Sequence, residues 1–189
     1  MTQDPFVWAQ SLDTLFEQVW SRLSRGVRDR HAPARHPTLA TVSTDGRPQL
    51  RTVVLRGAEK ADGTLRVYTD MHSHKVAELQ ATPFAALHIW DSSAHLQIRL
   101  ATLVTILTGA EVAELWHQLP DHARLAYGST PAPGTALPAA LDYSKTPDPT
   151  AFAVLHLTID SMDVVHLGPN HRRAAFRRED DWAGQWLAP

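Results

Sequence analysis

Three short segments carry side chains that suit the binding of an anion or of a polar ring. The first is Arg51-Thr52-Val53-Val54-Leu55-Arg56, in which two arginines bracket β-branched and aliphatic residues. Side chains alternate along a strand, so residues an odd number of steps apart point to opposite faces. On one extended strand the two arginines would lie roughly 16 Å apart and would serve two separate anions. The alternative is a pair of solvated arginines at the ends of a strand.

The second segment runs from a strand into the start of a helix. Tyr68 and Thr69 end the strand, and Ser73 is a good N-cap residue for the helix that follows. A helix N-terminus presents free N–H groups and positive dipole charge to an anion. His74 and Lys75 add donors or charge in the same turn, so the segment predicts a phosphate site. The alternative is an ordinary cap with two exposed basic residues.

The third segment is a long apolar strand that contains one amide. Gln97 lies among Leu96, Ile98 and Leu100. A buried amide needs hydrogen-bond partners, and the edge of a flavin ring offers alternating donors and acceptors that an amide matches. The alternative is a sheet position that is exposed on one face.

Other chemistries have little support in the sequence. The 11 histidines show no His-x-x-x-His pair in a clear helix with a carboxylate nearby, so no metal site is predicted. The absence of cysteine excludes thiolate sites and disulfides, and no Gly-x-Ser-x-Gly, Gly-x-Gly-x-x-Gly or phosphate-loop motif occurs. No general base stands out, so the catalytic residues stay unassigned.

Composition sets the class of protein. The formal net charge is -2, so no overall basic field would recruit nucleic acid or an anionic membrane. No apolar run is long enough to span a bilayer, and the first residues lack the pattern of a signal peptide. With 189 residues and no cysteine, the chain is expected to be a cytoplasmic protein with one domain, 1–189, that carries an N-terminal helical arm, 5–30.

The hydrophobic pattern predicts the elements that position these segments. A helix is expected from Pro5 to about Arg30, with Asp4 as its cap, and further helices at 73–80 and 109–119. A long surface loop is expected at 128–149. Strands are expected at 38–44, 49–56, 65–69, 84–90, 96–107, 152–159, 162–167, 171–177 and 182–187. Strands that follow one another without regular helical crossovers predict a mostly β (α+β) fold, an antiparallel barrel with peripheral helices.

Taken in order, these segments resemble a known family. The stretches TLATVSTDGRPQLRTVVLR, LRVYTDMHSHKVAELQATPFAALHIW and HLQIRLAT, with a chain ending in WLAP, are similar to the pyridoxamine 5'-phosphate oxidase-like FMN-binding split barrels. The region RLAYGSTPAPGTAL and the segment HRRAAF look more like the short, poorly characterised bacterial branch. The resemblance covers most of the chain from about Pro37 and implies FMN (flavin mononucleotide) bound at the interface of a homodimer.

The resemblance also implies roles for individual residues. The strand from Arg51 to Arg56 would lie along FMN, and Gln97 would hydrogen-bond its ring. The phosphate would be held by Arg51, Ser73, His74 and Lys75. The full cofactor-binding set is expected to be Arg51, Thr52, Val53, Val54, Leu55, Arg56, Tyr68, Thr69, Ser73, His74, Lys75 and Gln97.

The substrate side departs from the family's pattern. An Arg-x-His element is represented by Arg172 and Ala174, a later arginine is replaced by Phe176, and an expected tryptophan aligns with His166. The substrate-phosphate cluster is poorly matched around residues 119–123. Residues expected to face a small anionic substrate are Arg56, Arg124, Tyr127 and Arg172.

The leading hypothesis is therefore a flavin-dependent oxidoreductase that acts on an unidentified small molecule. One alternative is a flavin carrier or sensor without efficient turnover. Another is a split barrel that binds deazaflavin or haem.

Overall fold

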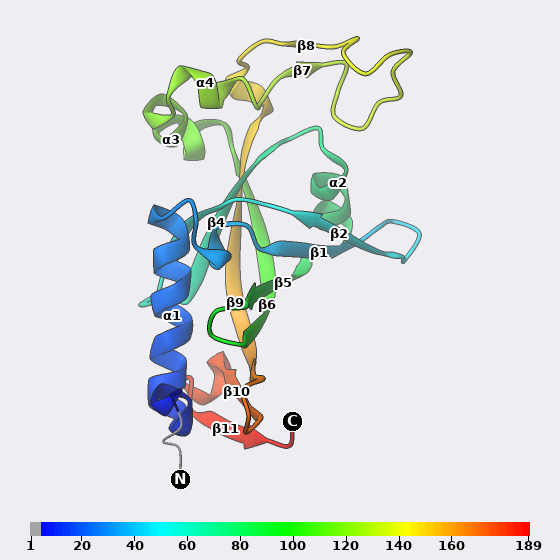
Figure 1. Ribbon diagram of the computed structural model, residues 1–189. Helices are drawn as coiled ribbons and strands as arrows, with labels where there is room; N and C mark the ends of the chain where they lie inside the picture. Colours follow the sequence, from blue (N-terminus) through cyan, green and yellow to red (C-terminus); the bar gives the residue numbers. More distant parts are fainter. Residues whose placement is uncertain (1–4) are drawn as a thin grey trace.

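The computed structural model describes residues 5–189 and shows one long helix beside a strongly curved antiparallel sheet (Figure 1). Helix α1 spans Leu12–Arg28 after a short 3₁₀ turn at Val7–Gln10. The continuous helix expected from Pro5 is thus wrong, because Ser11 is extended and starts α1 by accepting a hydrogen bond from the Thr14 N–H at 3.2 Å. Asp4, the expected cap, lies outside the described residues.

The antiparallel barrel expected from the sequence is confirmed. Its pairs run in the order β2-β1-β5-β6-β9-β4-β3, and every pair is antiparallel. The strands are β1 (Thr38–Val42), β2 (Pro48–Thr52), β3 (Leu55–Glu59), β4 (Thr64–Asp70), β5 (Phe84–Asp91), β6 (Leu96–Thr108), β9 (Phe152–His166), β10 (Arg172–Arg177) and β11 (Gly184–Leu187).

The expected strand 49–56 is wrong, and the correction separates two residues of interest. The strand stops after Thr52, and β3 begins at Leu55. β2 pairs with β1, whereas β3 pairs with β4 on the other side of the split. Arg51 and Arg56 therefore belong to different strands. The Val53 N–H bonds the Pro37 carbonyl at 3.0 Å and holds the crossing between the two strands.

The closing strands are three and not four, and the first of them is longer than expected. The predicted strands 152–159 and 162–167 are one strand, β9, whose pairing with β6 shifts by one residue between Ala101 and Thr102. The first half of β9 pairs with β4, and its second half pairs with β10. Because a bulge bends a strand without ending it, β9 leaves the barrel and carries β10 and β11 below it, as Figure 1 shows.

The helices expected inside the chain are present with small changes. α2 spans His74–Ala81 with Ser73 at the N-cap position, and α3 spans Ala113–Gln118 after a 3₁₀ turn at Gly109–Val112. α4 (Asp121–Arg124) follows α3. The expected loop contains two short strands, β7 (Ser129–Thr130) and β8 (Ser144–Lys145), that pair with each other over the top of the molecule.

The barrel interior and one face of α1 form a single apolar core. Leu15 and Leu23 of α1 are fully buried and belong to the same cluster as Leu39, Leu87 and Leu100 of the sheet. Helix α1 is thus packed against the barrel. The division of the chain into one domain, 1–189, with a helical arm at 5–30 stays a prediction. None of the helices within residues 5–189 has the length and apolar character needed to cross a bilayer.

Candidate functional site

Arg51 makes a buried ion pair with helix α2. Its guanidinium donates to the Oε2 atom of Glu78 at 2.8 Å and also to the hydroxyl of Thr41, which itself donates to Glu78. The Arg51 side chain is 23% exposed and that of Glu78 is 9% exposed. Strand β2 and the first turns of α2 are therefore fixed side by side, as the phosphate-site hypothesis requires.

Lys75 occupies the same corner from the helix side. Its Nζ atom donates to Thr69 Oγ1 at 2.9 Å and to Ser73 Oγ at 3.0 Å. Ser73 occupies the expected N-cap position, but its hydroxyl donates to the Asp70 carbonyl at 2.7 Å and does not cap the helix. The end of β4 and the start of α2 thus place an ammonium and two hydroxyls at a helix N-terminus.

Two positive charges lie close together in this corner. Burial lowers the pKa of Lys75 below its ordinary value, and the charge of Arg51 lowers it further. Asp70 and Glu78 act in the opposite direction but do not cancel the shift. Paired cations beside hydroxyls and free helix amides are the donor set that a phosphate group needs, so these residues fit the phosphate end of FMN.

Asp70 anchors the loop that crosses above this corner. One of its carboxylate oxygens accepts from the His72 N–H at 2.8 Å, and the other accepts from the Gly128 N–H at 3.0 Å. Further along the loop, a Cβ atom at Gly134 would lie 2.7 Å from the His74 ring. The loop therefore rests on His74, the residue expected to contribute to the phosphate site.

Arg56 lies on β3, next to Tyr68 of β4. Its guanidinium lies 5.7 Å from the centre of the Tyr68 ring. Burial raises the pKa of the Tyr127 hydroxyl, and the nearby charge of Arg56 opposes that rise. The structure thus brings Arg56, Tyr68 and Tyr127 together, beside the apolar cluster that contains Trp116 and Phe152.

The other arginines expected on the substrate side are engaged elsewhere. Arg124 donates to the carbonyls of Trp116 and His117 at 3.1 and 2.8 Å, so its guanidinium closes the end of α3. Arg172 lies on β10, below the barrel, with its Nη1 atom 3.4 Å from Nδ1 of the fully buried His166. The Arg124 guanidinium also lies 5.6 Å from the centre of the Trp116 ring, in the apolar cluster beside the Arg56 corner.

The residues between the two arginines take different positions. Thr52 is exposed at the end of β2, and Val54 is half-buried in the crossing. Val53 and Leu55 are buried in the central core. Two of the four side chains between the arginines are therefore turned into the core.

Gln97 lies on the opposite face of the sheet from Arg51. Residues directly across from each other on neighbouring strands share a face of the sheet. Arg51 is paired with Leu39, Leu39 with Leu87, and Leu87 with Leu100, so these four side chains lie on the same face. Gln97 is three residues from Leu100, so it points outward. Its Oε1 atom lies 3.4 Å from Nε2 of His88 on the neighbouring strand. One copy of the chain therefore does not bring Gln97 to the phosphate corner.

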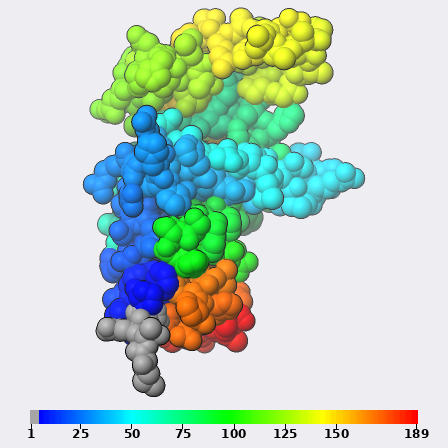
Figure 2. Space-filling model, viewed as in Figure 1, coloured from blue at the N-terminus to red at the C-terminus, as the bar shows by residue number. Residues whose placement is uncertain are grey.

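The outer face that carries Gln97 is largely apolar. Small side chains line its middle at Ala40, Ala86 and Ala101, which lie across from one another in the ladder. Large apolar side chains surround them, and the hairpin between β1 and β2 that carries two of these side chains projects from the body (Figure 2). The exposed residues are Val42, Leu50, Phe84, Trp90 and Leu103.

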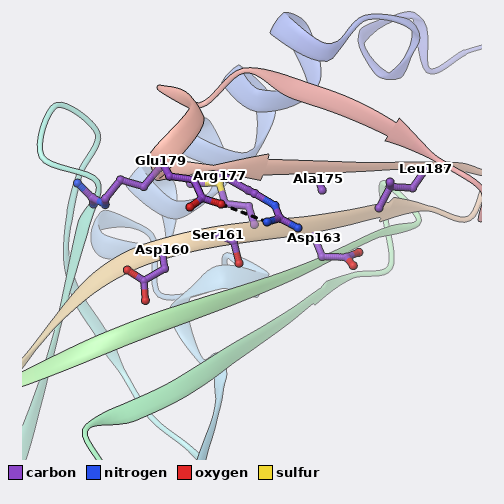
Figure 3. A pocket seen from close by; sticks show the side chains of 9 residues that line it. Asp160, Ser161, Asp163, Ala175, Arg177, Glu179 and Leu187 are labelled. Atoms are coloured by element: carbon purple, nitrogen blue, oxygen red, sulfur yellow. Dashed lines mark hydrogen bonds and ion pairs between the residues drawn. The ribbon is translucent and has the colours of Figure 1, made fainter.

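A groove of about 670 Å³ hollows the same outer face beside β9 and β10. Figure 3 shows Ser161 and Asp163 along its floor, with Arg177 paired to Glu179 at 3.2 Å along one wall. In the described part of the chain, no group of three or more His, Cys, Asp or Glu side chains is placed to hold a metal ion.

Sequence reasoning missed the acidic members of the site. Counted as whole residues, Glu78 inside α2 is 7% exposed and Asp70 at the end of β4 is 6% exposed. Both could have been recognised from the sequence as charged residues at positions that the helical or strand pattern turns inward. A buried carboxylate needs a partner, so each position indicates an ion pair or a hydrogen bond. Thr41 gave no signal, because threonine is common in strands.

Comparisons with known proteins agree with this architecture. Residues 8–108 match the sequence model of the family described as pyridoxamine 5'-phosphate oxidase, FMN-binding domain. Pyridoxine/pyridoxamine 5'-phosphate oxidase 2 of Arabidopsis thaliana is 27% identical over 171 residues, which cover 81% of this chain and 85% of that protein.

Two solved structures share the fold over the whole chain. A pyridoxamine 5'-phosphate oxidase-related, FMN-binding protein from Nostoc punctiforme superposes with a TM-score of 0.74 and 26% identity, covering 100% of this chain and 99% of the other. PhzG from Burkholderia lata, in complex with tetrahydrophenazine-1-carboxylic acid, gives a TM-score of 0.73 with the same coverage and 19% identity. The second likeness concerns the fold alone.

Proposed function

This chain belongs to the family of pyridoxamine 5'-phosphate oxidase FMN-binding domains, and from that premise we propose that it binds FMN and acts as a flavin-dependent oxidoreductase on a small substrate. The observation that carries the proposal is the meeting of Arg51 and Lys75 at the start of α2. When bound, FMN supplies the redox chemistry, and the protein supplies position and charge.

The phosphate corner is suited to a dianion. Lys75 has its Nζ atom within 3.0 Å of two hydroxyl oxygens, and Arg51 is held by Glu78 in an ion pair that fixes its direction. A phosphate between the two cations would relieve their repulsion and accept from the amides at the start of α2. Glu78 offsets one of the two positive charges of the corner, which keeps a net charge of about +1 from Arg51, Lys75 and Glu78.

We further propose that two copies of the chain build each FMN site. Arg51 and Lys75 lie toward the inner face of the sheet, and Gln97 lies on the outer face, so one chain supplies the phosphate end and a second supplies the amide for the ring. The apolar outer face around Ala86 and Ala101 supports such pairing, because large apolar patches mark protein contacts. The assembly is then a homodimer with FMN between the subunits.

The substrate end is assigned to the corner of Arg56, Tyr68 and Tyr127. Arg56 offers one cation there, and Tyr68 and Tyr127 offer aromatic surface and hydroxyls. Arg124 lies nearby over the Trp116 ring but donates to two carbonyls at the end of α3, so we assign Arg56 as the cation that meets the substrate. We propose a small substrate with one anionic group. We also propose a cytoplasmic location, which is in keeping with the absence of cysteine.

A binding assay tests the cofactor assignment. Arg51→Ala combined with Lys75→Ala should weaken FMN binding at least about 100-fold, because each charge-assisted hydrogen bond contributes about 1.5–3 kcal/mol. The affinity for riboflavin, which lacks the phosphate, should change little. Arg47→Ala, which removes an exposed arginine from the same hairpin, is the matched control. An FMN affinity within threefold of wild type in the double variant would refute the phosphate site.

Mixing two defective chains tests the shared site. We expect the Arg51→Ala, Lys75→Ala chain and a Gln97→Ala chain each to bind FMN poorly. In a mixed dimer, one site combines the intact phosphate corner of one chain with the intact Gln97 of the other. Co-refolded chains should therefore regain one FMN for each mixed dimer, and a mixture that regains none would contradict the two-chain site.

Turnover separates an oxidoreductase from a flavin carrier or sensor. Reduction of the bound flavin by small anionic substrates, followed by reoxidation by oxygen, would support the enzyme. A yellow protein that no tested substrate reduces would favour the carrier. A colourless protein that binds a deazaflavin, or a red one with a Soret band, would replace FMN as the cofactor.

A further inference from the structure

A three-residue charge cluster lies on the outer face of the sheet, away from the phosphate corner. The carboxylate of Asp163 on β9 accepts from Arg99 of β6 at 2.6 Å and from Arg173 of β10 at 3.2 and 2.7 Å. The side chains are partly exposed, at 50% for Arg99, 33% for Arg173 and 24% for Asp163. Neighbouring strands thus hold two guanidinium groups on one carboxylate.

The ladder places this cluster beside Gln97. Arg99 follows Gln97 by two residues on the same face, about 7 Å along the strand. Val165 is directly across from Gln97 on β9, and Arg173 is directly across from Val165 on β10. Asp163 is directly across from Arg99. Arg99 is therefore a same-face neighbour of Gln97, and Val165 separates Gln97 from Arg173.

The cluster carries a net charge of about +1. Burial opposes ionisation of Asp163, but the hydrogen bonds and charges of Arg173 and Arg99 outweigh it and hold the pKa of the carboxyl below its usual range. Asp163 is therefore ionised at neutral pH, and two cations face one anion. In the groove next to it, Arg177 is paired with Glu179 and adds no net charge.

We propose that Arg99, Asp163 and Arg173 form an electrostatic cluster that raises the reduction potential of the flavin ring held by Gln97. The proposal rests on the FMN site described above. Full reduction adds two electrons to the ring, and uptake of one proton leaves the reduced ring with one negative charge. A net positive charge near the ring stabilises that form relative to the neutral oxidised ring.

Asp163 has two opposing effects in this arrangement. It fixes both guanidinium groups in place beside Gln97, and its own charge limits how far they raise the potential. Removing an arginine charge and removing the carboxylate charge should therefore shift the potential in opposite directions. A purely structural role predicts shifts in the same direction, because each substitution would loosen the same cluster.

The experiment measures the reduction potential of the FMN-loaded protein by dithionite titration against a reference dye. Arg99→Gln and Arg173→Gln should each lower the ratio of reduced to oxidised flavin at a fixed potential about tenfold, which is a shift of about 30 mV for a two-electron couple. Asp163→Asn should raise that ratio by a similar factor. Arg25→Gln, which breaks an exposed pair with Asp29 on α1, is the matched control and should leave the ratio unchanged.

The outcomes distinguish this proposal from the cofactor assignment. Shifts of one sign in all three variants, or shifts no larger than that of Arg25→Gln, would overturn the electrostatic cluster while FMN binding stands. If the wild-type protein binds no FMN, both the cofactor assignment and the cluster fail. Thermal unfolding of each variant checks that the fold is retained. The two arginine variants test the positive charge of the cluster independently, because Arg99 lies on β6 and Arg173 on β10.

Discussion

Removing the negative charge of Glu78 should destabilise the protein and strengthen FMN binding. In Glu78→Gln the amide keeps the shape of the side chain and can still accept from Thr41, but it leaves the guanidinium of Arg51 without its counter-ion. Stability and affinity should thus move in opposite directions. This combination is unusual for a substitution at a buried position.

The magnitude follows from the geometry of the pair. Breaking a buried ion pair by removing one partner costs about 3–5 kcal/mol. Arg51 is 23% exposed and keeps its bond to Thr41, so solvent offsets part of that cost and about 2–3 kcal/mol is expected. For a chain of this size, each kcal/mol lowers Tm by about 2–4 °C, so Tm should fall by roughly 4–12 °C.

Calorimetry and flavin-fluorescence titration of the same preparations provide the assay. Glu17→Gln is the matched control, because Glu17 is 61% exposed and pairs with Lys60 on the surface. Such pairs contribute about 0–1 kcal/mol. Glu78→Gln should also bind FMN more tightly than wild type, with riboflavin unchanged, because Arg51 no longer shares its charge with a carboxylate. The reasoning is refuted if Glu78→Gln is no less stable than Glu17→Gln, or if it binds FMN more weakly than wild type.

Two further predictions test the packing of α1 and the charge of Lys75. Gly26→Ala should lower the free energy of unfolding by about 1–2 kcal/mol, although alanine favours helices, because the new Cβ would lie 2.7 Å from the Ala34 backbone. Calorimetry of this variant and of the exposed Ser21→Ala control provides the test. A gain in stability equal to that of Ser21→Ala would contradict the prediction. Burial, together with the charge of Arg51, depresses the pKa of Lys75 below 10.5 in the free protein, and a bound phosphate would raise that pKa. FMN affinity should therefore fall as the pH rises above the depressed pKa of the free protein. Lys75→Met should lack that additional slope, and identical pH profiles of the two proteins by fluorescence titration would exclude Lys75 from the phosphate site.

Much of the fold follows from local patterns in the sequence. The β-branched runs located β1, β4, β5 and β6 to within about two residues of their ends. Ser73 marked the start of α2, and the proline-rich stretch marked the loop that carries β7 and β8. These features depend on residues close together in the chain, so the sequence alone is enough to find them.

The errors arose where tertiary contacts override a local pattern. The apolar run from Arg51 to Arg56 reads as one strand, but the crossing at Val53 lets β2 pair with β1 and β3 pair with β4. Ser161 and its neighbours read as a break, but the long pairing with β6 carries β9 through it. In both cases the partner strand, many residues away, decides where a strand ends.

The sequence by itself determined which chemical groups are candidates for binding: Arg51, Lys75 and a helix start as a predicted anion site, and Gln97 as a predicted partner of a polar ring. Only the tertiary structure decided how they are grouped. Glu78 reaches Arg51 across 27 residues of chain, and Gln97 lies on the other face of the sheet. Side-chain alternation gives the relative faces within one strand. The pairing of distant strands and the packing of α2 decide which face meets the helix and which stays exposed.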